Sequence, residues 1–138
     1  MNRADFQHLT DLRLKEAKLL LDAKCFEGAY YLAGYAIEFA LKACIAKKTK
    51  EHDFPDKKLV AQIYRHDPVE LLKATGLETE LQRQAKSNKD FQRFWAVVVN
   101  WSPEARYDTV RTQLSATDLW AAITDGQDGI LQWLKKRW

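Results

Sequence analysis

The sequence predicts an all-α protein, an up-and-down antiparallel bundle of about four to six helices in one domain over residues 1–138. Three observations favour this fold class. Apolar residues recur at helical spacing in most segments. Five Gly and three Pro are too few for a turn-dense β-sandwich. Two segments begin with the residue pattern of a capping box.

Two long antiparallel helices are expected first, over Phe6–Lys24 and Glu27–Lys48. The second is apolar nearly all the way round, because only Glu38 and Lys42 are charged between residues 28 and 46. A helix of this kind has to be covered on every side, so it belongs at the centre of the fold or in a dimer interface. Small residues that permit close helix packing form a stripe along it, at Ala29, Ala33, Ala36, Ala40 and Cys44.

Local signals divide the rest of the chain. A polar linker is expected over Lys47–Lys58, where Pro55 stops any helix before it. Asp67 caps a helix that has Pro68 at its first position, and Gly76 ends that helix near Thr75. Three further helices are expected over Lys57–Tyr64, Leu77–Lys86 and Lys89–Trp101. A short turn of helix follows over Ser102–Tyr107, and then a loop over Asp108–Leu114. The final helix is expected over Ser115–Trp138, where Gly126 and Gly129 weaken it.

Composition excludes several classes of protein. The longest uncharged stretches, Gly28–Ile37 and Phe94–Pro103, are far shorter than the roughly 20 residues that span a bilayer, so no membrane partner is expected. The first residues lack the apolar region of a signal peptide, which predicts a cytoplasmic protein. Cys25 and Cys44 match neither a redox nor a zinc spacing, and Cys44 is expected to be a buried apolar residue. We expect no metal and no cofactor.

Five polar residues are candidates for a binding site. Glu38 and Lys42 are one helical turn apart, so they form either an ion pair at a helix edge or a polar patch that lines a pocket. His66 precedes a helix N-terminus, where backbone N–H groups favour anions. Arg106 and Tyr107 follow a Ser-Pro turn, where they either brace the bundle or contact a phosphate. The hypothesis is one ligand-binding cleft that contains all five, with His66 and Arg106 as the candidates for catalysis.

The remaining aromatic and basic features have simpler interpretations. Trp101, Trp120 and Trp133 are expected in the core or in dimer packing, since no dense basic run accompanies them. The run Lys135-Lys136-Arg137 suits the negative end of a helix dipole, with a phosphate-contacting tail as the alternative.

Four segments in this order resemble the HEPN domain family of bacteria and archaea. They cover nearly the whole chain, and the helix YAIEFALKA and the helix start HD..ELL are the strongest of them. The segments are GAYYLAGYAIEFALKA (Gly28–Ala43), HDPVELL (His66–Leu72), WSPEARY (Trp101–Tyr107) and the closing GILQWLKKRW.

The resemblance implies a small helical bundle that pairs into a homodimer. It also implies one of two functions. Some members are metal-independent RNases, often toxins that a nucleotidyltransferase-type antitoxin holds. Others are regarded as non-catalytic binders of RNA or nucleotide, or as modules beside a nucleotidyltransferase partner.

The motif of the RNase members is an Arg followed, after four to six residues, by a His on a late core helix. His52 and His66 have no Arg at this spacing before them. Arg3 and His8 have it, but at the start of the chain. The leading interpretation is therefore a dimeric module that binds a nucleotide, RNA or a nucleotidyltransferase-like partner without the standard catalysis. An RNase of the toxin type is the alternative, and a purely structural interaction domain is the third.

Overall fold

The structure is a computed structural model that describes residues 1–49, 53–54 and 56–138. The described residues form helices joined by turns and loops, with no strand, which confirms the all-α prediction. Their eight α-helices and one 3-10 helix outnumber the four to six expected. They are α1 (Arg3–Asp22), α2 (Phe26–Ala46), α3 (Lys57–Ile63), α4 (Pro68–Thr75), α5 (Glu78–Ser87), α6 (Lys89–Val99), η1 (Pro103–Tyr107), α7 (Gln113–Thr124) and α8 (Ile130–Lys135).

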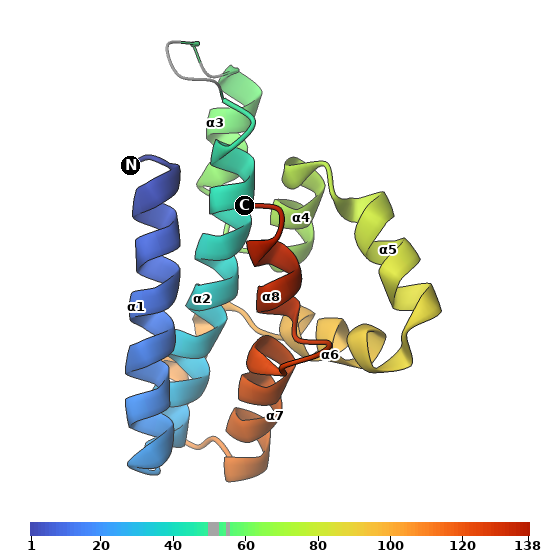
Figure 1. The fold of residues 1–138 in the computed structure, drawn as a ribbon. Helices are drawn as coiled ribbons and strands as arrows, with labels where there is room; N and C mark the ends of the chain where they lie inside the picture. The colour runs from blue at the N-terminus through green and yellow to red at the C-terminus, as the bar shows by residue number, and fades with distance from the viewer. Residues whose placement is uncertain (50–52, 55) are drawn as a thin grey trace.

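Helix α2 forms the centre of the bundle, as its apolar composition predicts. It lies antiparallel to α1 and also contacts α3, α4, η1, α7 and α8 (Figure 1). The members of the small-residue stripe are all buried inside this one chain: Ala29, Ala33, Ala36, Ala40 and Cys44. The stripe therefore packs helices within the protomer, and it is not exposed for a dimer interface.

Trp101 fixes the end of α6 against α2. Its indole packs on Gly34, where an added Cβ would lie 2.0 Å from Trp101 Cε2. The indole Nε1 donates a hydrogen bond to the main-chain carbonyl of Tyr31 over 3.2 Å. Because Gly34 leaves room for the ring, Trp101 is buried and sets the position of η1, which follows directly.

Arg111 anchors the segment between η1 and α7 from the other side. Its guanidinium lies over the Tyr30 ring at 3.7 Å and pairs with Asp108. Its main-chain N–H donates to Glu27 Oε1 over 3.1 Å. The loop that carries η1 is thus held at both ends by contacts with α2.

The helix-start and helix-end signals around α4 are confirmed. Asp67 Oδ1 accepts hydrogen bonds from the backbone N–H groups of Val69 and Glu70, over 2.8 and 3.1 Å. Gly76 follows the helix with a φ of 78°, a left-handed conformation that glycine adopts without strain. Residues 50–52 and 55, and with them part of the expected linker, lie outside the described residues.

The expected final helix over Ser115–Trp138 is wrong. The structure has two helices there, and the first begins earlier because Thr112, not Ser115, is its cap. The chain turns between them, where Asp125 Oδ2 accepts from two backbone N–H groups, those of Gln127 and Asp128, over 3.1 and 2.9 Å. A Cβ on Gly129 would lie 2.5 Å from the Asp125 carbonyl oxygen, so this turn requires glycine.

The burial of Cys44 and of three tryptophans agrees with the packing that the sequence predicts. Trp101 and Trp133 are buried and Trp120 is half-buried against the core. Cys44 is also buried, and burial raises the pKa of its thiol to about 11. In the described part of the chain, every helix is too short or too polar to cross a bilayer.

Candidate functional site

The candidate site is built on a buried carboxylate of α2. Glu38 is 1% exposed, and an ionised carboxylate at such depth is costly unless it is paired. Lys42, one turn later, supplies the charge: its Nζ donates to Glu38 Oε1 over 2.8 Å. The expected pair thus exists, but it is buried in the bundle, not at an exposed helix edge.

His66 brings a third polar side chain to the same oxygen. Its Nδ1 lies 2.9 Å from Glu38 Oε1, and its side chain is 55% exposed. The neighbouring Asp67 caps α4, so the loop that carries the imidazole is fixed at its base. We call Glu38, Lys42 and His66 the Glu38 cluster, which joins a buried carboxylate to the surface through a half-exposed ring.

The second oxygen of the carboxylate is the unusual feature. Glu38 Oε2 is buried and has no hydrogen-bond partner among the described residues. Leaving a buried acceptor unsatisfied costs about 1–3 kcal/mol, so folded proteins rarely do so. This oxygen, beside a half-exposed histidine, can therefore accept a hydrogen bond from a further donor.

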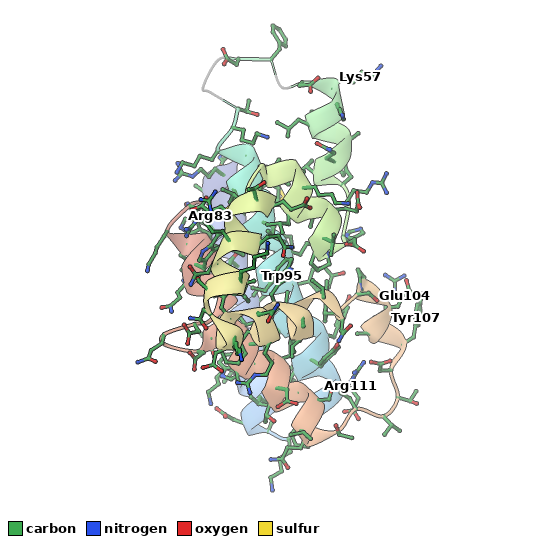
Figure 2. All side chains as sticks on the ribbon, turned by 90° about the vertical axis from the view of Figure 1, so that its right-hand side faces the viewer. Lys57, Arg83, Trp95, Glu104, Tyr107 and Arg111 are labelled. Carbon is green, nitrogen blue, oxygen red and sulfur yellow. The ribbon has the colours of Figure 1, made fainter. Side chains whose placement is uncertain are left out.

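Arg106 and Tyr107 lie on η1 and are exposed. The Arg106 guanidinium lies over the Tyr107 ring at 4.8 Å, with its Nη2 3.8 Å from Glu104 Oε1. Glu104 and Tyr107 project from the edge of the molecule (Figure 2). The described contacts join neither Arg106 nor Tyr107 to the Glu38 cluster. The structure therefore brings three of the five predicted residues into direct contact.

Tyr35 connects the two groups of residues electrostatically. Its pKa is raised, first by burial, then by the Tyr31 hydroxyl, and further by the negative charge of Glu38, while the positive charge of Arg106 lowers it. Its ring packs edge-on against Tyr31 and Trp101, with centroids 5.2 and 5.1 Å away. Tyr35 therefore lies within electrostatic range of both Glu38 and Arg106, and the sequence reasoning did not include it among the candidates.

The alternative Arg-His pair at the start of the chain does not converge. Residues five apart on a helix point about 140° apart, so Arg3 and His8 face different directions on α1. Arg3 donates to the Trp138 carbonyl, and His8 is exposed. His52, the remaining histidine, lies outside the described residues.

The basic end of the chain is partly tied to the bundle. Arg137 Nη2 pairs with Glu80 Oε1 over 2.6 Å, and its guanidinium lies over the Trp133 ring at 3.7 Å. Lys135 pairs with Asp11 across the surface over 3.0 Å. These contacts favour the structural interpretation of a helix terminus.

The chain belongs to the HEPN domain family, whose sequence model matches residues 11–136, nearly the whole chain. This family includes RNases and modules associated with nucleotidyltransferases, and its members often dimerise. A search of curated proteins finds no match, and a search of solved structures finds none either. In the described ranges, no three metal-ligating side chains gather into a cluster.

Proposed function

We propose that this HEPN protein is a homodimeric module that binds a nucleotide, free or within RNA, over the Glu38 cluster. It does so without the standard catalysis of the RNase members, because no histidine follows residue 66 where their motif belongs. A nucleotidyltransferase-type protein is its proposed partner.

One observation carries the proposal: the buried Glu38 Oε2 has no partner among the described residues. Ribose hydroxyls and the amino groups of bases donate to a carboxylate oxygen, and either would satisfy it. Since the oxygen is buried, a neighbouring group has to move for the ligand to reach it, and we infer that this group is the half-exposed His66 ring, which contacts the other oxygen of the same carboxylate. The buried Lys42 keeps the carboxylate in place when His66 moves.

We place Arg106 and Tyr107 at the rim of this site, where they suit the other parts of a nucleotide. Arg106 is exposed, and a guanidinium binds phosphate through two parallel hydrogen bonds. Tyr107 is exposed beside it, and an aromatic face stacks with any base.

The test is a calorimetric titration with AMP and with a short single-stranded RNA. Arg106→Ala is expected to weaken binding about tenfold to a hundredfold, because a hydrogen bond to a charged group contributes roughly 1.5–3 kcal/mol. Arg93→Ala is the matched control. Like Arg106, Arg93 is exposed, pairs with a nearby carboxylate, that of Asp90, and lies over the aromatic ring of the following residue, Phe94. Absence of binding to the unaltered protein, or equal losses in both variants, would contradict the proposal.

A second candidate function, RNA cleavage, has an observation of its own. Glu38 holds the Nδ1 of His66, which leaves Nε2 of a half-exposed ring for another partner. A carboxylate that orients a histidine in this way is an arrangement typical of a general base. RNA cleavage in the presence of a chelator, lost in His66→Gln and kept in His8→Gln, would favour this candidate. If the protein neither cleaves nor binds, the structural interaction domain is the better interpretation.

A further inference from the structure

A hollow of about 640 Å³ lies at one end of the bundle, at the end of α2 and about two helical turns beyond Glu38. It is formed by the start of α1, the end of α2 and helix α3, which lie at the same end of the molecule (Figure 1). Its volume falls within the range of about 300–1,000 Å³ that small-molecule pockets occupy. No residue of the Glu38 cluster lines it.

Helix α3 has apolar side chains that the protein covers only in part, because Leu59 and Ile63 are half-buried against the core and Val60 is exposed. None of its seven residues is buried, although Leu59, Val60 and Ile63 all line the hollow. A helix of this length is not stable in water by itself, and it depends on the packing of its apolar face. The other wall is also apolar, because Ile45 and Ala46 of α2 line it.

The charged side chains in the described lining of this hollow are basic. Arg3 and Lys47 line it, and its described lining contains no acidic side chain. Lys47 Nζ donates over 3.3 Å to the main-chain carbonyl of Arg137, a neutral acceptor that leaves its positive charge in place, and Arg3 donates to a main-chain oxygen of Trp138. Asp53 and Asp56 line a neighbouring hollow, which neither Arg3 nor Lys47 lines.

We propose that this hollow is a second binding site, for a small amphiphilic anion. An apolar chain lies against Leu59, Val60 and Ile63 and covers the apolar surface that the core leaves exposed there. Its anionic group meets Arg3 and Lys47. The proposal is independent of the nucleotide site, because the two sites share no residue.

Decanoate is the probe, and decylammonium and decanol, which have the same chain length, are the comparison ligands. Calorimetry is expected to give saturable one-site binding of decanoate, weaker binding of decanol and none of decylammonium. Val60→Asp places a negative charge at the apolar wall and is expected to weaken decanoate binding by about tenfold or more. Val110→Asp is the control, because Val110 is 83% exposed and lines none of the hollows described.

A second variant keeps the test decisive if Val60→Asp unfolds α3. Ala46→Phe fills the hollow from α2 and is expected to abolish decanoate binding while the circular dichroism spectrum and melting temperature stay unchanged. The double variant Arg3→Gln, Lys47→Gln is expected to bring the affinity for decanoate down to that for decanol. Lack of saturable decanoate binding would overturn the proposal. So would equal affinity for decylammonium, or equal affinities of the Val60→Asp and Val110→Asp variants.

Discussion

Replacing Gly34 by alanine is expected to lower the free energy of unfolding by about 3 kcal/mol, at the upper end of the usual cost of overpacking a core. The added methyl group would lie 2.0 Å from Trp101 Cε2, so the indole has to leave its place. When it does, the hydrogen bond from Trp101 Nε1 to the Tyr31 carbonyl is lost, and η1 loses its anchor. Chemical denaturation of the two proteins measures the loss.

Two controls separate this clash from a general effect of alanine. Gly126→Ala is expected to change stability little, because nothing lies within 4 Å of an added Cβ there. In a Trp101→Ala background, Gly34→Ala is expected to stabilise the protein by roughly 0.5–1 kcal/mol, since alanine is the better residue in a helix interior. A loss of stability in that background would show that the indole is not what Gly34 accommodates.

The second large effect is expected at Glu38. Glu38→Ala leaves the ammonium of Lys42 buried without its partner, which is expected to cost about 3–5 kcal/mol in a denaturation experiment. The exposed pair of Lys18 and Asp22 has the same four-residue spacing on α1. Asp22→Ala is therefore the matched control, with an expected cost of about 0.5 kcal/mol or less.

Replacing both charges tests whether the pair exists for stability. The double variant Glu38→Leu, Lys42→Leu is expected to be as stable as the unaltered protein or more stable by about 1–4 kcal/mol, because the cost of burying two charges disappears. The protein would then keep the pair for something other than folding. A double variant as unstable as Glu38→Ala would identify the cluster as structural and remove the main support for a ligand site.

Patterns within one segment were sufficient to predict most of the fold. The lack of charge along α2 predicts its central position, since only a helix that is covered on all sides can be so apolar. Asp67 and Gly76 mark the ends of α4 because the side-chain cap and the left-handed turn are made by residues a few positions apart.

The predicted final helix over Ser115–Trp138 is wrong because the turn that interrupts it has weak local signals. Gly126 and Gly129 are compatible with a bent helix as well as with a break. The structure breaks the helix because the Asp125 side chain binds the backbone of the following residues and Gly129 packs against the Asp125 carbonyl. That geometry depends on where the core places α8, which the sequence pattern does not state.

Part of the candidate site could likewise be predicted from the sequence, and part could not. Glu38 and Lys42 were predictable as a pair because four residues separate neighbours on a helix face. The contact of His66 with Glu38 spans 28 positions and depends on how α4 packs on α2. Tyr35 carried a signal in its position one turn before Phe39 and close to Glu38, but that spacing is also typical of core packing.

Nuclear magnetic resonance of the histidine side chains tests the central claim, that the Glu38 cluster is a ligand site. In a protein with ¹⁵N-labelled histidine, AMP is added while the imidazole signals are recorded. The claim predicts that the His66 signals shift with the midpoint found by calorimetry and that the His8 signals, from an exposed ring on α1, stay in place. Saturable AMP binding that leaves the His66 signals unmoved would contradict it.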